Sequence, residues 1–358
     1  MVAPEMEISQ GGITFAAMNQ VSVIILSWNS RSYLQKFLPM LEAFTPADIA
    51  DIVVVDNGSS DGTIEWLSAE YPGIELQVLD RNYGYAGGYK IAINGIKTEY
   101  AVLLNSDVEV TPGWLAQLLS FMQKHPKAGA VAPKIRSYAD RDFFEYAGAA
   151  GGWIDRYGYP FCRGRIFNSI EKDHGQYDQP MKVFWASGAC LMVRTEAYRL
   201  AGELDPLFFA HMEEIDLCWR LHSSGYEVWY NPESLIFHVG GGTLPNESPK
   251  TLFLNFRNNL LLLQKNLPRH LRGKTMFARK ILDGLAAIQY LLKGKPEFFM
   301  AVLKAHRDFY RLWKEEYHNF SGPVHPAPFQ LDGWYNRSIV AAFFIAGKKR
   351  FNALNHQR

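Results

Sequence analysis

In this 358-residue sequence, the leading candidate for a chemical role is Asp107. It follows the apolar run at 101–104 and the polar pair Asn105 and Ser106. Such a run is typical of a buried parallel strand whose carboxyl end opens into a site. A carboxylate there can bind Mg²⁺ or Mn²⁺, which neutralise the phosphates of a nucleotide. Asn and Asp are also ordinary turn residues, so a simple turn stays an alternative.

Three carboxylates, Glu213, Glu214 and Asp216, form a second candidate group. Apolar residues recur at helical spacing through 215–219, and Gly225 is a stop signal, so the acids lie in the first turn of a predicted helix. Acids stabilise the positive amino end of a helix, which is one explanation for them. Repulsion among three carboxylates would also raise the pKa of at least one, and a raised pKa suits a general base.

His238 ends the apolar run at 234–237 and precedes a glycine cluster. A histidine beside apolar residues is more often a satisfied core or turn residue than a metal ligand. The residue alone therefore does not predict a metal site.

The elements that would position these residues alternate between strand and helix. Largely apolar runs at 21–26, 52–55 and 101–104 predict buried strands, and a further strand is expected at about 75–79. Helices are expected at about 30–41, 64–70 and 111–124. Polar residues follow the strands, which indicates an α/β protein with a Rossmann-like, mostly parallel sheet flanked by helices and a ligand site along that edge. Residues 136–182 are poorly periodic and are interpreted as an irregular excursion over the site. Further strands are expected at 189–194, 226–230 and 234–238.

Residues 83–95 carry four glycines. They are interpreted as a tight connection that needs positive φ, or as backbone that approaches a nucleotide closely. No G-x-G-x-x-G follows the first strand, which argues against a dinucleotide site.

Composition and charge divide the chain. It is 48% hydrophobic and 20% charged, as in a globular protein, yet residues 1–250 carry a net charge of −11 and residues 251–358 a net charge of +12. The acidic first part argues against nucleic-acid binding, whereas a basic region rich in Leu, Phe and Trp suits an anionic membrane surface. We expect a loosely ordered leader without a secretory signal at 1–20, a catalytic domain at 21–250 and a basic helical region at 251–358.

The three cysteines show no C-x-x-C spacing. This argues against a disulfide framework or zinc site and fits a reducing cytoplasm.

Eight motifs occur in order between residues 21 and 259. They are Val-Ser-Val-Ile-Ile-Leu-Ser-Trp-Asn at 21–29, Val-Val-Asp-Asn-Gly-Ser-Ser-Asp-Gly-Thr at 54–63, Arg-Asn-x-Gly-Tyr-Ala-Gly-Gly at 81–88, Leu-Leu-Asn-Ser-Asp at 103–107, Trp-x-Ser-Gly-Ala-Cys at 185–190, Glu-Glu-x-Asp-Leu-Cys-Trp-Arg at 213–220, His-x-Gly-Gly at 238–241 and Phe-Arg-Asn-Asn at 256–259. This set, within residues 21–265, resembles the inverting glycosyltransferases of family 2 with the GT-A fold. The similarity extends to the subgroup of bacterial rhamnosyltransferases and galactofuranosyltransferases.

The resemblance implies roles for particular residues. Asp107, at the last position of the family's D-x-D motif, and His238 would bind the Mg²⁺ or Mn²⁺ that bridges the donor diphosphate, and Glu214 would be the catalytic base. The nucleotide-sugar would be bound by Ser27, Trp28, Asn29, Asp56, Arg81, Asn105 and Ser106. The acceptor pocket would be lined by Trp185, Glu213 and Asp216. The implied reaction transfers a sugar, first of all rhamnose, from a nucleotide-diphosphate donor to a saccharide or lipid-linked saccharide in bacterial surface polysaccharide synthesis.

Two positions depart from the family pattern. Asn105 stands where the first Asp of D-x-D is expected, which puts metal contact on that side in doubt. Glu stands at the base position where Asp is commoner, which leaves Glu213 as an alternative to Glu214.

Two other classes of protein are weighed against this one. A sugar-phosphate nucleotidyltransferase would usually carry a glycine-rich basic loop after the first strand, where this chain has Ser-Trp-Asn-Ser. A non-catalytic saccharide-binding relative would not need Asp107, Glu214 and His238 together. A processive synthase is disfavoured because the chain has neither Q-x-x-R-W nor several membrane spans.

Residues 298–313 predict an amphipathic helix. It would lie on the inner face of the cytoplasmic membrane, making the protein peripheral, or pack on the catalytic domain or a second copy in a homodimer.

Overall fold

A computed structural model describes residues 19–240, 248–317 and 328–354. The predicted leader at 1–20 lies almost entirely outside the described residues. The elements are, in chain order, β1 (Val21–Ser27), α1 (Arg31–Phe44), β2 (Ala50–Asp56), α2 (Thr63–Glu70), β3 (Glu75–Val78), α3 (Gly84–Gly95), β4 (Tyr100–Asn105), β5 (Val108–Val110), α4 (Trp114–Lys124), β6 (Ala128–Ser137), β7 (Gly152–Asp155), β8 (Pro160–Cys162), β9 (Arg165–Ile166), β10 (Ser169–Ile170), β11 (Met181–Lys182), β12 (Cys190–Arg194), α5 (Thr195–Leu200), η1 (Pro206–Phe208), α6 (Glu213–Ser223), β13 (Glu227–His238), α7 (Pro249–Asn266), α8 (Arg269–Leu292), α9 (Pro296–Glu315), η2 (Pro328–Gln330), β14 (Trp334–Tyr335), α10 (Ile339–Phe344) and η3 (Phe351–Ala353).

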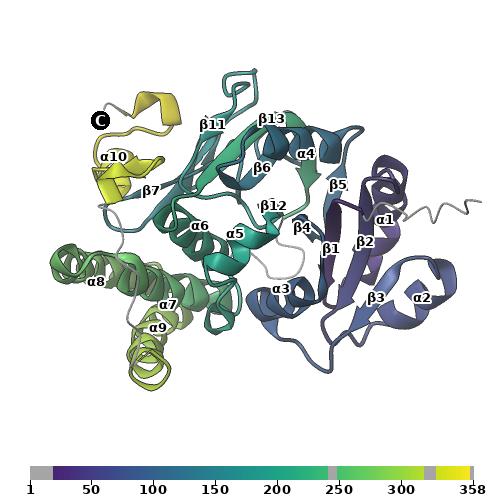
Figure 1. The fold of residues 1–358 in the computed structure, drawn as a ribbon. Coiled ribbons are helices and arrows are strands. Elements are labelled where there is room, and N and C mark those ends of the chain that lie inside the picture. Colours follow the sequence, from purple (N-terminus) through teal and green to yellow (C-terminus); the bar gives the residue numbers. More distant parts are fainter. Residues whose placement is uncertain (1–18, 241–247, 318–327, 355–358) are drawn as a thin grey trace, which may run out of the picture.

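A mixed, mostly parallel sheet forms the centre of the molecule (Figure 1). Within the described residues its strand order is β11-β13-β6-β12-β4-β1-β2-β3, and β5 pairs with β13. β1 runs parallel to β2 and β4, whereas β12 runs antiparallel to β4 and β6. The carboxyl ends of β1, β2 and β4 therefore meet at one edge, as the polar residues after these runs predict.

Both faces of the sheet are buried because successive side chains of a strand point to opposite faces. In β1, Val21, Val23 and Ile25 belong to the core cluster that also holds apolar residues of α1 and α4, whereas Ile24 belongs to the cluster on the other face, with residues of α3 and α6. A strand covered on both faces has to be apolar throughout, which explains the unbroken Val and Ile runs.

The glycine-rich segment is a helix, α3, and not the connection interpreted from its composition. Its first residue, Gly84, has φ +73°, and a Cβ there would lie 2.5 Å from the Phe209 carbonyl oxygen. A Cβ on Gly88 would lie 2.6 Å from a methyl of Leu26. The glycines therefore allow close packing of α3 against β1 and the 208–212 loop.

The segment at 136–182, expected to be irregular, contains most of a second sheet. β10, β9, β8, β7 and β14 pair in that order, so a strand from near the end of the described chain completes a sheet begun about 180 residues earlier. The strands expected at 226–230 and 234–238 are one strand, β13, with a register shift between Asn231 and Leu235.

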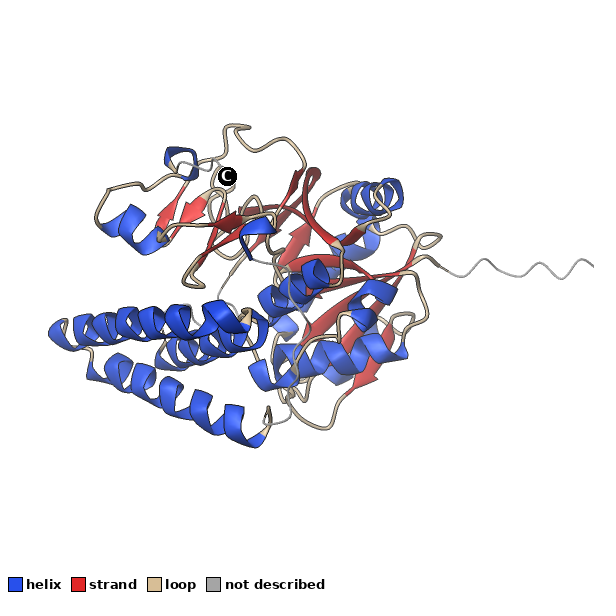
Figure 2. Ribbon diagram, turned by 60° about the vertical axis from the view of Figure 1, so that its left-hand side comes forward, coloured by secondary structure: helices blue, strands red, loops and turns tan. Residues whose placement is uncertain are grey.

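The later part of the chain forms three long helices, α7, α8 and α9, which lie together at one end of the molecule (Figure 2). α9 covers the predicted amphipathic segment and buries its apolar residues Ala301, Val302, Ala305, Phe309 and Leu312. It contacts α7 and α8, so this apolar face packs within the protein. None of the helices in the described part of the chain is both long enough and apolar enough to span a bilayer.

Candidate active site

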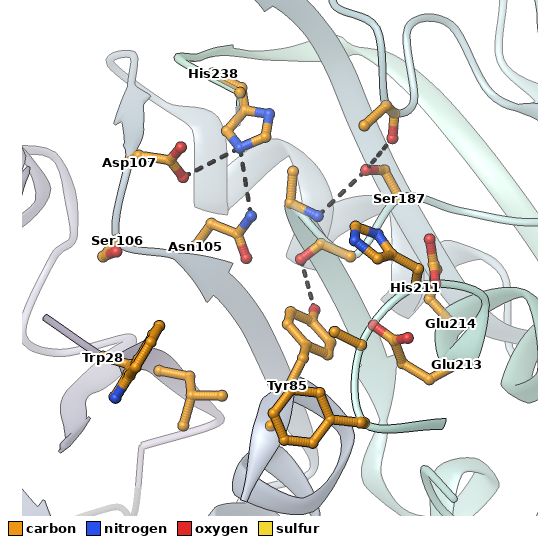
Figure 3. Close-up of a pocket in the computed structure, with 18 of the residues that line it drawn as sticks. Trp28, Tyr85, Asn105, Ser106, Asp107, Ser187, His211, Glu213, Glu214 and His238 are labelled. Atoms are coloured by element: carbon orange, nitrogen blue, oxygen red, sulfur yellow. Dashed lines mark hydrogen bonds and ion pairs between the residues drawn. The ribbon is translucent and has the colours of Figure 1, made fainter. Parts of the chain in front are cut away.

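A cavity of about 240 Å³ opens at the carboxyl ends of β1 and β4, opposite the first turn of α6 (Figure 3). Among the predicted site residues, it is lined by Trp28, Asn105, Ser106, Asp107, Glu213, Glu214 and His238. These residues span more than 200 positions of the sequence. The fold therefore brings together the residues predicted to bind metal and to act as base.

Asp107 and His238 are in contact on one wall of this cavity. His238, the last residue of β13, places Nε2 3.1 Å from Asp107 Oδ1 and 3.3 Å from the Asn105 amide nitrogen, while its Nδ1 lies 3.4 Å from a Glu145 carboxylate oxygen. Burial alone would lower the pKa of His238, but the flanking carboxylates of Glu145 and Asp107 raise it to about 10. Burial would raise the pKa of Asp107, yet its hydrogen bond with His238 lowers it below the ordinary value.

These residues fit a divalent cation. Nε2 of His238 cannot donate to Asp107 and accept from the Asn105 amide at the same time, because the first contact needs N–H and the second a lone pair. Glu145 behind Nδ1 has the position of the carboxylate that orients a metal-binding histidine. Among the described residues no group of three or more His, Cys, Asp or Glu side chains is arranged to hold a metal. The remaining ligands would therefore come from phosphate and water, as is usual for Mg²⁺ with nucleotides.

Glu213 and Glu214 form the opposite wall, at the first two positions of α6. Burial raises the pKa of Glu214 to about 7, and burial together with the charge of Glu214 raises that of Glu213 well above its ordinary value. One carboxylate oxygen of each has no hydrogen-bond partner among the described residues. Glu214 therefore has a pKa near neutrality, where a general base works best.

The loop that leads into α6 is strained and clamped. Phe209, His211 and Met212 all have φ between +64° and +73°, a region costly for residues with side chains. Asn258 of α7, fully buried, donates its side-chain amide to the carbonyls of Phe208, Ala210 and His211 at 2.7–2.8 Å.

Arg257, the neighbour of Asn258, donates to the carbonyls of Leu207 and Phe208. The Arg-Asn pair of the Phe-Arg-Asn-Asn motif thus holds the backbone that positions both glutamates.

Asp216 does not line the cavity, contrary to its predicted place in an acceptor pocket. It is fully buried and contacts Arg220, Lys265 and Asn266. Burial would raise its pKa, but Arg220 and Lys265 lower it to about 2. Asp216 therefore fixes α6 to α7 through charged hydrogen bonds.

Trp185 does not line the cavity either. It is buried, donates to the carbonyl of Trp153 and covers Gly152, where a Cβ would lie 2.1 Å from its indole. Trp185 and Asp216, predicted to line the acceptor pocket, therefore do not line this cavity, because both side chains are buried in packing contacts.

The other residues predicted to bind nucleotide surround the cavity without lining it. Ser27 is buried and hydrogen-bonded to Ser30, Asn29 accepts from the Ser60 amide, and Arg81 lies over the Tyr83 ring. Asp56, at the end of β2, is buried.

One oxygen of Asp56 accepts from the Ser59 amide, and the other has no partner within the described chain. That free oxygen could accept a hydrogen bond from a nucleotide base or ribose.

Sequence reasoning missed several residues of the cavity wall: Tyr85, Glu145, Ser187, His211 and Lys250. Tyr85 and Ser187 belong to two of the motifs, which was an available signal. Tyr85 donates to the Gly188 carbonyl at 2.6 Å. Burial lowers the pKa of His211 to about 4, so it is neutral at pH 7. No pattern in the sequence indicates Glu145 or Lys250.

Comparison with known proteins gives a consistent family. Residues 22–200 match the family described as Glycosyl transferase family 2. The N-acetylglucosaminyl-diphospho-decaprenol L-rhamnosyltransferase of Mycobacterium tuberculosis is 28% identical over 234 residues, covering 60% of this chain and 75% of that protein. Rhamnosyltransferase WbbL of Escherichia coli is 24% identical over 276 residues, covering 75% of this chain and 98% of that protein.

Solved structures show the same fold. GalNAc-T7 with UDP, GalNAc and Mn²⁺ superposes with a TM-score of 0.55 at 16% identity, over 87% of this chain and 58% of that one. The mannosyltransferase PcManGT from Pyrobaculum calidifontis, in complex with GDP-Man and Mn²⁺, superposes with a TM-score of 0.51 at 14% identity, over 83% of this chain and 88% of that one. At these identities the likeness concerns the fold alone.

Proposed function

This chain belongs to glycosyl transferase family 2 and is a glycosyltransferase that uses a nucleotide-sugar donor, and on that premise we propose a metal-dependent, inverting transfer. The sugar goes to a hydroxyl group of a saccharide or lipid-linked saccharide acceptor in bacterial surface polysaccharide synthesis. The observation that carries the proposal is that a carboxylate with a pKa near 7, Glu214, shares one cavity with the Asp107–His238 pair. Family membership removes the nucleotidyltransferase alternative.

Glu214 is the proposed base. With a pKa of about 7 it is largely ionised slightly above neutral pH and can accept the proton of the acceptor hydroxyl. The hydroxyl oxygen forms a bond to the anomeric carbon as the bond to the nucleoside diphosphate breaks on the opposite face, which inverts the configuration. Glu213, whose pKa is raised well above its ordinary value by burial and by the charge of Glu214, lines the cavity beside the base and is proposed to contact the acceptor.

Asp107 and His238 are proposed to hold Mg²⁺ or Mn²⁺, with the Asn105 amide beside them. A bound cation supplies charge neutralisation for the departing diphosphate. Trp28 and Ser106 line the same side of the cavity and are proposed to contact the donor. The Mn²⁺ in the structures of GalNAc-T7 and PcManGT supports this assignment.

The finer identity of donor and acceptor is proposed from the relatives. Two of them are named as rhamnosyltransferases, at 24% and 28% identity, which supports an activated rhamnose as the first donor to try. The decaprenol-linked acceptor in the name of the mycobacterial relative supports a lipid-linked saccharide.

Donor binding is tested first, by thermal stabilisation. A panel of nucleotide-sugars is screened with and without Mn²⁺, because a ligand that binds the folded form raises the melting temperature. We expect the rhamnose donor to stabilise the protein most, and only with metal. Stabilisation by another nucleotide-sugar would change the donor but keep the reaction class.

The role of Glu214 is tested by Glu214→Gln. Transfer should fall by about 10²-fold or more, as expected for loss of a general base, while donor-induced stabilisation is retained. Glu196→Gln is the matched control, because Glu196 is also an acid in the first turn of a helix, α5, but is exposed and away from the cavity. If Glu213→Gln lost most transfer activity while Glu214→Gln had normal turnover, Glu213 would be the base.

A further inference from the structure

Helix α8 buries two charged residues against the rest of the protein. Arg279 and Asp283 are buried and paired at 2.7 Å, and the Arg279 guanidinium lies 3.9 Å from the centre of the Tyr159 ring. Asp283 also contacts His306 of α9 at 3.1 Å. The face of α8 that packs on the protein therefore includes a charged pair beside the apolar Met276 and Ala287, unlike the mainly apolar inner face of the usual surface helix.

The outward face of α8 is apolar. Phe277, Ile281, Leu285, Ile288 and Leu292 recur at steps of four, four, three and four residues, and each is at least 50% exposed in the described structure. At 1.5 Å per residue this stripe is about 22 Å long. A continuous exposed apolar stripe of this kind marks an interaction surface, unlike apolar residues that are exposed singly.

Positive charge surrounds the stripe. Lys274 is exposed before it, and Lys293 and Lys295 are exposed after it. Residues 269–315, the α8–α9 hairpin, hold eleven lysines and arginines against four acidic residues.

A groove of about 320 Å³ between α8 and α9 adds cations and aromatic rings. Its walls include Arg269, Arg272, Lys280, Tyr310 and Trp313. Arginine and lysine side chains bind phosphate groups, and Tyr and Trp are enriched at membrane interfaces.

We propose that α8 docks on an anionic lipid bilayer, with Phe277, Ile281, Leu285, Ile288 and Leu292 inserted among the acyl chains and the flanking lysines on lipid phosphates. Charge complementarity favours this occupant over a second copy of the chain. A two-fold dimer would bring the same cationic hairpin against itself, and like charges repel. The assignment differs from the sequence interpretation, which placed residues 298–313 in the interface. In α9 the residues Ala301, Val302, Ala305, Phe309 and Leu312 are buried, and those that stay exposed, such as Met300 and Leu303, form no stripe as long as that of α8.

The docking surface stands on its own geometry, whereas its use in catalysis rests on the proposed lipid-linked acceptor. An enzyme bound to the membrane encounters a lipid-linked acceptor by diffusion in the plane of the bilayer. The surface therefore predicts an orientation for the whole protein: the α8 side faces the lipid.

The test is vesicle flotation of the full chain with phosphatidylcholine vesicles, with and without phosphatidylglycerol. Wild type should float with the phosphatidylglycerol vesicles at low salt and be released by high salt, because the lysine contacts are screened. Leu285→Glu and Ile288→Glu should each weaken binding by about tenfold or more. Leu200→Glu, which changes an equally exposed leucine at the end of α5, should bind as wild type does.

Melting curves show that each variant is folded, and donor hydrolysis without acceptor measures the active site separately. Equal binding by all variants, or no binding by a wild type that hydrolyses donor, would overturn the docking surface and leave the proposed function standing. A concentration-dependent dimer that Leu285→Glu abolishes, without vesicle binding, would replace the bilayer by a second copy. Vesicle binding without any donor hydrolysis would instead count against the proposed function.

Discussion

Asn258→Ala should disturb the position of the proposed base, Glu214, and leave donor binding intact. The side chain of Asn258 lies in α7, has no exposed surface and contacts three carbonyls of the loop that carries Glu213 and Glu214. It touches neither Asp107 nor His238, on the other wall of the cavity. Its removal should therefore disturb the base side and spare the donor side.

The magnitude follows from the contacts. A neutral hydrogen bond contributes about 1 kcal/mol, and the two N–H groups of the Asn258 amide share the three carbonyls, so their loss should lower the free energy of unfolding by about 2 kcal/mol. Phe209, His211 and Met212 each hold a positive φ that costs about 1 kcal/mol or more. The hydrogen-bond energy of the clamp and the strain energy of the loop are thus of similar size, so the loop should relax when the clamp is removed. A displacement of about 1 Å at a reacting group reduces the rate of transfer by about 10²-fold.

The assay is steady-state transfer with a donor titration, at a temperature where the variant is folded. We expect kcat to fall by about 10²-fold while the donor KM changes by about twofold or less. The control is Asn255→Ala on the same helix, because Asn255 donates to the Thr251 carbonyl of α7 itself at 3.0 Å, its one side-chain hydrogen bond within the described residues. That variant should differ from wild type by about 0.5 kcal/mol or less.

One result would refute the reasoning. If Asn258→Ala loses stability but keeps kcat, the loop holds its conformation without the clamp and the strain estimate is wrong. A rise in donor KM with unchanged kcat would instead place Asn258 on the donor side.

Three further predictions concern the same cavity and its support. Because Glu214 must be ionised to accept a proton, kcat/KM should rise about tenfold per pH unit below its pKa of about 7 and level off above it, and Glu214→Gln should lose this dependence. Its folded pKa exceeds the ordinary value of 4.5, so the carboxyl group disfavours folding increasingly as pH rises from about 4.5 to about 7, and the melting temperature of Glu214→Gln relative to wild type should be higher at pH 8 than at pH 4. Asp107→Asn should abolish the Mn²⁺-dependent part of donor stabilisation in melting curves, and chelation of metal should do the same to wild type. Lys265→Met should lower the free energy of unfolding by about 3–5 kcal/mol in urea titrations, because it leaves the buried carboxylate of Asp216 short of one cation.

The strands around the cavity were predictable from sequence because a strand that is buried on both faces needs a continuous run of apolar residues. β1, β2 and β4 each appear as such a run, and the polar residues after β4 mark the mouth of the sheet. The meeting of Asp107 with His238 depends on the antiparallel pairing of β13 with β5, which sets His238 opposite Val108, and the family resemblance indicated it where no local pattern did.

The second sheet could not be predicted, for two physical reasons. Strands β8, β9 and β10 are two or three residues long, too short for an alternating pattern to emerge. β14 pairs with β7 from a distant part of the chain, and nothing local in Trp334 or Tyr335 encodes that partner.

Asp216 shows how a correct helix can yield a wrong site residue. Its place in the first turn of α6 was predictable, but the direction of its side chain depends on Lys265 and Asn266, 49 and 50 residues later. Glu145 was missed because it lies outside the helices and strands, in a segment without periodicity. Its partner His238 lies on β13, far away in the sequence.

The pairing of β14 with β7 also has a consequence for synthesis on the ribosome. Ile154 leaves the ribosome 180 residues before its partner Trp334. At about 5–20 residues per second the delay is roughly 10–40 s. During that interval the nascent chain carries an unpaired edge on β7, and until Asn258 has been synthesised the loop before α6 also lacks its clamp. We expect translation, and not the intrinsic speed of collapse, to set when the catalytic cavity first becomes competent.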